Sequence, residues 1–416
     1  MAITDIEAHA DGGEDLDAIV VAADRFIRSQ LPSAWVDAVD RGDIDAMFAA
    51  RSSVEPAEIW RRVAAGGYIV PTWSVEHGGL GLSPRAGAAT MRVLGRYRLP
   101  SFQSTVGVDL VGPALLKWGT TEQQQRYLRP IASYHEIWCQ LFSEPGAGSD
   151  LAGLALRATR DGDSWLLNGQ KVWTSMGDVA DLGLLLARTA PELPKHRGIT
   201  VFLLPMDFPG ITIRPIRQLT GEAEFSEIFI DDVVIDDSMR LGAENEGWRV
   251  ATSVLMNERR AVSASGASMP GTVTGRSINA LIARHAPLAD WSLRQRLAQA
   301  YIEDKVVTLT NQRAADRRRA GQPPGPEGSI GKLLFSEHTQ RLQNLAVDLE
   351  GCAAQAWPED DRWLKGTAWS LLRVRSKTIA GGTSEIQRNI LGERILGLPK
   401  EPEVDRDVAW SQVLRS

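Results

Sequence analysis

Residues 154–175 read LALRATRDGDSWLLNGQKVWTS, and this stretch decides the fold class. It consists of short runs rich in Leu, Val and Trp, which favour β-strands over helices. Two pairs typical of tight turns, Asp161-Gly162 and Asn168-Gly169, separate the runs. We therefore expect antiparallel strands in the middle of the chain.

The β-rich texture begins near Trp138 and continues well beyond this stretch. Further strand-like runs lie at Gly198–Pro205, Gly210–Arg217 and Phe225–Ile235. Many short strands separated by turn residues are typical of compact all-β modules. A small antiparallel barrel or sandwich is the natural interpretation.

On both sides of this region the pattern is helical, with apolar residues recurring every three or four positions. It covers most of residues 14–131 and returns after Gly247. The later helices are expected at Ser253–Ser265, Ser292–Arg318, Ile330–Leu349 and Glu385–Leu396. Gly351 follows the third as a stop signal, and the Gly- and Pro-rich residues 321–328 predict an irregular connection. The expected order is α, then β, then α.

Composition excludes several classes of function. The 416 residues predict two or three compact units at about 150 residues each. A net charge of −6 argues against nucleic acids and acidic membranes as partners. Cys139, Cys352 and six scattered histidines lack the spacing of a metal site or a disulfide framework. Because no leader and no apolar run of about 18 residues is present, we expect a cytoplasmic protein without integral membrane contact.

Three loops combine features that suit a cofactor. The first, QLFSEPGAGSD at residues 140–150, offers hydroxyls at Ser143 and Ser149 and a fixed φ at Pro145. Its glycines let backbone N–H groups approach an anion or a ring oxygen. Taken alone, the loop is more typical of an ordinary hairpin turn.

The second loop, Val172-Trp173-Thr174-Ser175, places a Trp beside two hydroxyl residues at a strand end. Such a Trp can stack on a planar ring while the hydroxyls bond its heteroatoms. A Trp in the core with hydroxyls on the surface explains the same residues. Taken alone, the stretch is more typical of this second interpretation.

The third loop, IAGGTSEIQR at residues 379–388, has Ser384 and Gln387 at the spacing of a capping box. A helix should therefore start here, with Gly381 and Gly382 just ahead of its N–H-rich end. Such an end suits an anion or the electron-rich edge of a cofactor. A simple glycine-led helix entry is the alternative.

In their order and intervals these loops resemble those of the acyl-CoA dehydrogenase flavoproteins, particularly actinobacterial members. The likeness extends from the Gly78-Gly79-Leu80-Gly81 loop to Leu398. It implies an α+β multidomain fold with an N-terminal helical domain (1–136), a middle antiparallel β-barrel (137–245) and a C-terminal four-helix bundle (246–416). It also implies assembly as a homotetramer or homodimer.

The resemblance implies FAD as the cofactor and gives roles to individual residues. The implied contacts of the flavin ring and its surroundings are Phe142, Ser143, Gly148, Ser149, Trp173 and Ser175, and those of the pyrophosphate and adenosine are Thr383 and Glu385. Asp348 and Gly351 look like positions that touch the FAD of a neighbouring subunit. Arg294 or Arg296 would replace the arginine that usually reaches FAD across the dimer. Ser149 near the thioester and Arg259 facing CoA would bind substrate.

The resemblance also points to the base. Many family members carry a catalytic Glu where this chain has Gly381, which cannot take a proton. A second branch, with isovaleryl- and long-chain-type enzymes, places the Glu before the CoA-facing arginine, and that position here is Glu258. The alternative is an exposed carboxylate paired with Arg259 or Arg260. The backbone N–H of Gly381 would bond the thioester oxygen.

The implied reaction is FAD-dependent α,β-dehydrogenation of an acyl-CoA to the trans-2-enoyl-CoA. Glu258 would take the α-proton, flavin N5 would accept the β-hydride, and an electron-transfer flavoprotein would accept the electrons. One alternative is a flavin oxidase or monooxygenase on the same fold. Another is one subunit of a mixed oligomer acting on steroid or carrier-protein thioesters, although a silent subunit has no need for Glu258. Met256, where relatives often carry an Asp that contacts pantetheine, leaves CoA and carrier protein both open.

Overall fold

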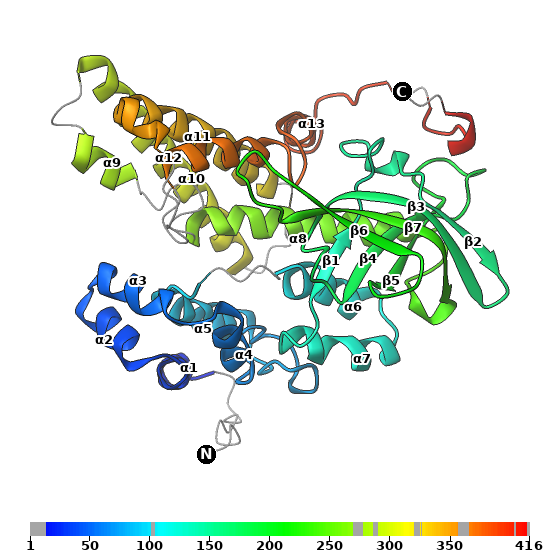
Figure 1. Cartoon of the computed structure of the whole chain (residues 1–416), viewed down its shortest axis with the longest axis horizontal. Coiled ribbons are helices and arrows are strands. Elements are labelled where there is room, and N and C mark those ends of the chain that lie inside the picture. Colours follow the sequence, from blue (N-terminus) through cyan, green and yellow to red (C-terminus); the bar gives the residue numbers. More distant parts are fainter. Residues whose placement is uncertain are drawn as a thin grey trace. The chain divides into compact units, whose positions relative to one another are not determined.

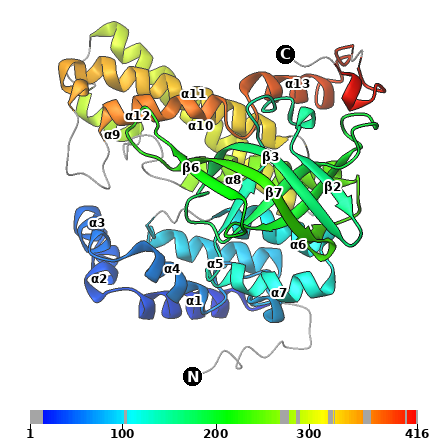
Figure 2. The same ribbon diagram turned by 45° about the vertical axis from the view of Figure 1, so that its right-hand side comes forward.

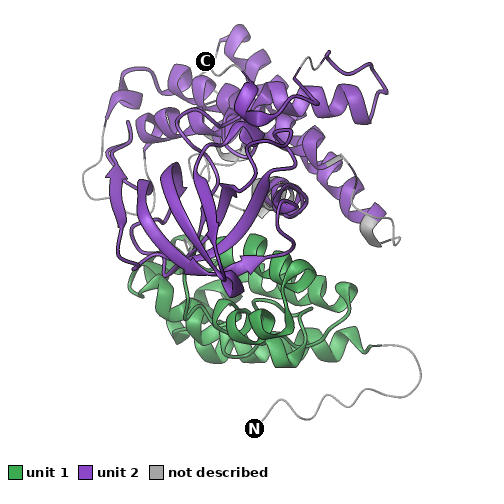
Figure 3. Cartoon of the chain, turned by 90° about the vertical axis from the view of Figure 1, so that its right-hand side faces the viewer, with its two compact units in different colours: residues 1–138 green, residues 139–416 purple. Residues whose placement is uncertain are grey.

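The computed structural model describes residues 14–100, 105–268, 278–285, 290–319, 325, 327–356, 366–402 and 405–413. The chain divides into two compact units, Met1–Trp138 and Cys139–Ser416 (Figure 3). Every residue expected to bind cofactor or substrate belongs to the second unit. The further division of that unit into a middle domain and a helical bundle stays a prediction.

The first unit is helical, as its periodicity predicts. Its helices are α1 (Leu16–Gln30), α2 (Ser33–Arg41), α3 (Ile44–Ser52), α4 (Pro56–Ala64), α5 (Pro84–Arg96), α6 (Gly112–Trp118) and α7 (Thr121–Ala132), with a π-helical turn at Val106–Val111. Side chains supply the helix caps: Asp15 accepts from the start of α1, and Thr120 with Gln123 forms a capping box at α7. Ile27 and Trp35 are fully buried in its core.

A single sheet dominates the first half of the second unit (Figure 1). Its strands are β1 (Trp138–Leu141), β2 (Arg157–Asp161), β3 (Ser164–Ser175), β4 (Leu182–Arg188), β5 (Ile199–Pro205), β6 (Ile211–Ile216), β7 (Phe225–Asp236) and β8 (Arg240–Leu241). They run in the order β6-β7-β3-β2-β4-β5-β8, and β1 pairs with β4. Trp165, Leu185 and Phe202 lie in the buried core of the sheet.

The expected closed barrel is wrong in one respect, because the sheet is open. Among the described strands, β6 and β8 lie at opposite ends of the order and do not pair. In the middle, β2 and β4 meet in parallel through one position, Arg157 with Arg188. The buried Arg188 guanidinium there bonds the carbonyls of Ala152 and Leu154, so the segment before β2 is held by a side chain. The flanking pairs, such as β2–β3 and β4–β5, are antiparallel as expected.

One of the two predicted turns is also wrong. Asp161-Gly162 does join β2 to β3, but Asn168-Gly169 lies inside β3, where the register with β7 shifts. The Asn168 side chain bonds Asp232 in both directions at 3.0 Å. Gly169, at φ 150°, presses on Leu156, and a Cβ there would lie 2.8 Å from the Leu156 Cα. The pair therefore makes a β-bulge that permits close packing.

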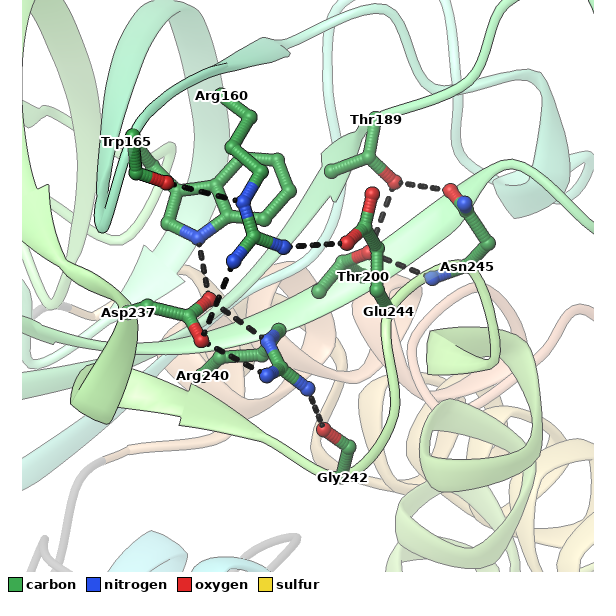
Figure 4. A network of polar contacts seen from close by, with 10 residues as sticks. Arg160, Trp165, Thr189, Thr200, Asp237, Arg240, Gly242, Glu244 and Asn245 are labelled. Carbon is green, nitrogen blue, oxygen red and sulfur yellow. Dashed lines mark hydrogen bonds and ion pairs between the residues drawn. The ribbon is translucent and has the colours of Figure 1, made fainter.

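A polar network ties the end of the sheet to the next helix (Figure 4). Asp237 accepts from Trp165 Nε1 at 2.7 Å and from Arg240 at 2.9 and 2.8 Å. Beside it, Thr200 Oγ1 accepts from the Asn245 backbone N–H at 2.9 Å. These bonds fix residues 237–246, which lead directly into α8, the helix that carries Glu258.

The remaining helices of the second unit pack around α11. They are α8 (Gly247–Ser268), α9 (Ile278–His285), α10 (Trp291–Arg319), α11 (Glu327–Glu350), α12 (Thr367–Arg373) and α13 (Ser384–Arg394). α11 contacts α8, α10, α12 and α13, while α8 also contacts β5, so α8 lies between sheet and helices (Figure 2). Most of the predicted 321–328 connection lies outside the described residues. No helix in the described ranges is long and apolar enough to cross a membrane.

Candidate functional site

A buried ion pair fixes the loop that follows β1. Lys171 is fully buried, and its Nζ donates to the Phe142 carbonyl at 2.9 Å and to Glu144 Oε1 at 2.8 Å. Glu144 also accepts the backbone N–H groups of Ala155 at 2.6 Å and Leu156 at 2.9 Å. Burial lowers the pKa of Lys171, and the charge of Glu144 opposes that shift. This loop is far more strongly held than an ordinary hairpin turn.

The second predicted loop lies directly beside the first. The Ser143 carbonyl accepts the Val172 N–H at 2.9 Å, so the residue before Trp173 is tied to the loop. Trp173 is 58% exposed and sits at φ 59°, a left-handed conformation that costs about 1–3 kcal/mol for a bulky residue. The Phe225 ring lies edge-on to it, with the two ring centroids 6.0 Å apart. A strained, exposed Trp next to exposed Ser175 offers a surface for a planar ring.

The third loop starts a helix as predicted, but with a different cap. Thr383, not Ser384, is the N-cap of α13, and its hydroxyl accepts the Ile386 N–H at 3.2 Å. Gln387 Nε2 instead donates to the carbonyls of Gly381 and Gly382 at 3.0 and 3.2 Å. The predicted capping box is therefore wrong, because both glycines adopt positive φ, 68° and 86°, and turn their carbonyls toward Gln387.

A cleft of about 520 Å³ opens at the start of α13. Thr383, Ser384 and Glu385 line it from α13, and Gln340, Arg341 and Asn344 line it from α11. The Ser384 hydroxyl is buried and has no protein partner. Hydrogen bonds at the helix start, first from its own backbone and then from Thr383, lower the pKa of Glu385. The predicted pyrophosphate and adenosine positions thus border a polar cleft at a helix N-terminus.

Glu258 lies where α8 faces the start of the first loop. Its Oε2 accepts from Gln140 Nε2 at 3.4 Å, and Gln140 belongs to β1, two residues before Phe142. Burial raises the pKa of the Glu258 carboxyl, against smaller opposing effects of Gln140, Arg259 and Lys332. A half-buried carboxylate with a raised pKa has the properties of a general base. The alternative, a solvated carboxylate on a helix surface, does not describe this environment.

The neighbours of Glu258 on α8 differ in environment. Arg259 is half-buried; burial first, and the charge of Arg394 second, lower its pKa. Met256 is 43% exposed. The Arg260 side chain lies outside the described residues. A guanidinium on this helix, close to a carboxylate and to a second arginine, suits a polyanionic ligand such as the phosphates of CoA.

Lys332 of α11 is the functional candidate that the sequence interpretation missed. It has no exposed surface, and its Nζ donates to the Gly382 carbonyl at 2.5 Å. Burial lowers its pKa to about 8, and the charges of Glu258, Glu385 and Glu337 oppose that shift. The available signal was a lone Lys in the apolar run Ile330–Phe335, since an isolated buried lysine needs a partner.

The residues predicted to reach a neighbouring subunit gather at the far end of α11. Asp348 pairs with Arg296 at 2.6 Å, so the structure brings together one predicted contact and one candidate arginine. Gly351 ends α11 at φ 56°, with open space where a Cβ would stand. Arg294, two residues before Arg296 on α10, is exposed.

The described residues fit a flavin dinucleotide. A planar ring needs an apolar or aromatic cover and nearby donors, which Trp173 and the loop at 142–149 offer. A pyrophosphate needs N–H groups and cations, which the α13 start and Arg341 offer at the cleft. No group of three His, Cys, Asp or Glu within the described ranges is placed to hold a metal ion.

Family profiles match almost the whole chain. The profile for the acyl-CoA dehydrogenase N-terminal domain covers residues 14–135, the middle domain covers 139–233 and the C-terminal domain covers 245–396. Among curated relatives, acyl-CoA dehydrogenase IpdE1 of Mycobacterium tuberculosis is 40% identical over 353 residues, which is 83% of this chain and 89% of the relative. Acyl-CoA dehydrogenase FadE34 of the same species is 36% identical over 86% of this chain and 49% of its own length.

Solved structures share the fold. The Tcur3481-Tcur3483 steroid ACAD superposes with a TM-score of 0.75 at 28% identity, over 95% of this chain and all of that chain. PigA with FAD and proline superposes with a TM-score of 0.71 at 22% identity, over 94% of this chain and all of that chain, which is a likeness of fold alone.

Proposed function

The chain belongs to the acyl-CoA dehydrogenase family and is an oxidoreductase that dehydrogenates acyl-CoA thioesters, and we propose that Glu258 is the base that removes the α-proton. One observation carries the assignment of the base. The Glu258 carboxylate lies against Gln140 of β1, the strand that leads into the predicted flavin loop. The position where many family members carry the base is Gly381 in this chain.

We propose that this chain's own residues bind the thioester and hold its proton acceptor. Glu258 takes the α-proton, and its raised pKa makes it a stronger base than an ordinary carboxylate. The Gly381 N–H donates to the thioester oxygen, where negative charge develops as the proton leaves. Arg259 binds the CoA portion. FAD held by the residues at 142–149, 173–175 and 383–385 would supply the acceptor for the β-hydride.

A reductive titration tests the proposed function. The purified protein is loaded with FAD and mixed without oxygen with short, branched, long and steroidal acyl-CoAs, the last because a structural relative is named a steroid ACAD. We expect at least one thioester to bleach the flavin absorbance and to yield the trans-2-enoyl-CoA. A panel that leaves the flavin oxidised throughout contradicts the proposal.

The electron acceptor is tested in the same cuvette. We propose an electron-transfer flavoprotein, so the reduced protein should reoxidise slowly in air and quickly when that flavoprotein is added. Reoxidation by air alone within seconds would instead identify an oxidase. The comparisons favour the dehydrogenase, since the curated relatives reported above carry that name.

An exposed apolar stripe on α10 supports the proposal that the protein assembles. Ile302, Val306 and Leu309 are 55%, 43% and 62% exposed and recur at helical spacing on one face. We propose that this stripe packs against a second copy in a homodimer or homotetramer. Light scattering of the purified chain should give a multiple of its 45.5 kDa mass. A monomer that assembles only with a second, homologous chain would point to a mixed oligomer.

A further inference from the structure

We propose that Lys332 is a positioning residue for the dehydrogenation, holding the Gly381–Gly382 turn in place and keeping Glu258 ionised. This inference rests on the proposed function, since it assigns Lys332 a role toward the base and the turn named there. Lys332 touches neither substrate nor cofactor in this assignment. It acts through the carbonyl of Gly382 and through its charge.

The first part of the argument is geometric. A fully buried ammonium donates to the Gly382 carbonyl at 2.5 Å, and Gln387 Nε2 donates to the same carbonyl at 3.2 Å. The neighbouring Gly381 carbonyl accepts from Gln387 at 3.0 Å. Two glycines in succession otherwise leave the backbone free to rotate. Both carbonyls of the turn are therefore fixed from α11 and α13, and with them the direction of the Gly382 and Thr383 N–H groups that share their peptide planes.

The second part is electrostatic. The charged groups that act on Glu258 are Arg259 on its own helix and Lys332 on α11, while the polar Gln140 faces it from β1. Burial raises the pKa of Glu258 and both cations lower it again. Without Lys332, the carboxyl would therefore be protonated at a higher pH, and a protonated carboxyl cannot accept the α-proton.

The cost of burying this lysine supports a role in the site. Its pKa of about 8 shows that the surroundings disfavour the ammonium, even though Glu258, Glu385 and Glu337 favour it. An apolar residue of similar length would avoid that penalty altogether. A charge kept at a cost to stability, beside the base and on the turn, is typical of a functional site.

The test compares Lys332→Met and Lys332→Arg with the wild type in anaerobic flavin reduction by the best acyl-CoA, from pH 5.5 to 9. The rate should fall at low pH as Glu258 takes up a proton. In Lys332→Met we expect this acid limb to move up by about one pH unit and the plateau to fall about 10- to 100-fold, because the turn loses its anchor. Lys332→Arg keeps the charge, so its limb should stay in place.

Lys377→Met is the matched control. Lys377 is also a partly buried lysine with a pKa that burial lowers, but the charges that act on it are Arg373 and Glu224 rather than Glu258. Its variant should keep the wild-type limb. A Lys332→Met protein with the wild-type limb and plateau would overturn the inference, as would an equal shift in Lys377→Met.

A second readout needs neither FAD nor substrate. The folded-state pKa of Lys332, about 8, lies below its ordinary 10.5, so between these values the unfolded chain binds more protons than the folded one. The melting temperature of the wild type should therefore rise relative to Lys332→Met from pH 8 to 10.5. If the difference in melting temperature did not change with pH, the proposal that Lys332 is a buried charged group would be wrong. A wild type that no thioester reduces would contradict the proposed function, and this melting comparison would still test the lysine.

Discussion

Glu258→Gln protein is expected to bind FAD and to lose flavin reduction by acyl-CoA roughly 10²- to 10⁴-fold, the range that general-base removal typically costs. The amide keeps the size of the side chain and can still contact Gln140, so the surrounding packing is preserved. It cannot accept a proton. Stopped-flow absorbance of the flavin, with the retained FAD counted from the same spectrum, separates loss of chemistry from loss of cofactor.

The pH dependence of flavin reduction tests the same role of Glu258. The active form of Glu258 is deprotonated, and burial raises its pKa. The wild-type rate should therefore rise with pH, and this rise should occur at a higher pH than the titration of an ordinary carboxyl group. Glu258→Gln should show no such rise in its residual rate. Glu246→Gln, which alters an exposed carboxylate paired with Arg249 just before α8, is the control and should behave as wild type. Equal rates in wild type and Glu258→Gln would remove Glu258 from the mechanism.

Local sequence signals predicted the order of the helices and strands and the positions of the loops. They did not predict whether the sheet closes into a barrel. Asp161-Gly162 makes the expected turn because no distant residue packs against Gly162, where an added Cβ would meet open space. Asn168-Gly169 carries an equally good turn signal, yet Leu156, just before β2, and Asp232 of β7 hold it inside β3. The open sheet has the same origin, because strand propensity does not state which two edges meet.

At the site, residue types and spacing predicted a candidate base and three loops, whereas contacts between residues far apart in the sequence were not predicted. Glu258 lies beside the start of the first loop, since it accepts from Gln140, 118 positions away in the sequence, and its role as the base stays a prediction. The capping interpretation failed because Gln387 has two possible bonding targets, and the positive φ of both glycines decides between them. Lys332 was missed because its acceptor, the Gly382 carbonyl, lies 50 residues away.

Glu144→Leu should destabilise the second unit by about 3–5 kcal/mol, the usual cost of breaking one side of a buried ion pair. Of the two acceptors of the fully buried Lys171 ammonium, Glu144 would be lost and the Phe142 carbonyl would remain. The N–H groups of Ala155 and Leu156 would lose their acceptor as well. Urea unfolding monitored by tryptophan fluorescence should show a lower midpoint. The variant should also lose FAD, because the predicted flavin loop is no longer held.

The double variant Glu144→Leu/Lys171→Met shows where that cost arises. Removing both charges avoids the unpaired ammonium, so part of the stability should return, but two backbone N–H groups stay without an acceptor at about 1–3 kcal/mol each. Recovery should therefore be incomplete. Lys195→Met is the matched control, since its two partners, Asp150 and Asp405, are 63% and 31% exposed, and ion pairs in contact with solvent are worth about 0–1 kcal/mol each. A Glu144→Leu effect no larger than that of Lys195→Met would show that the buried pair does not hold the loop.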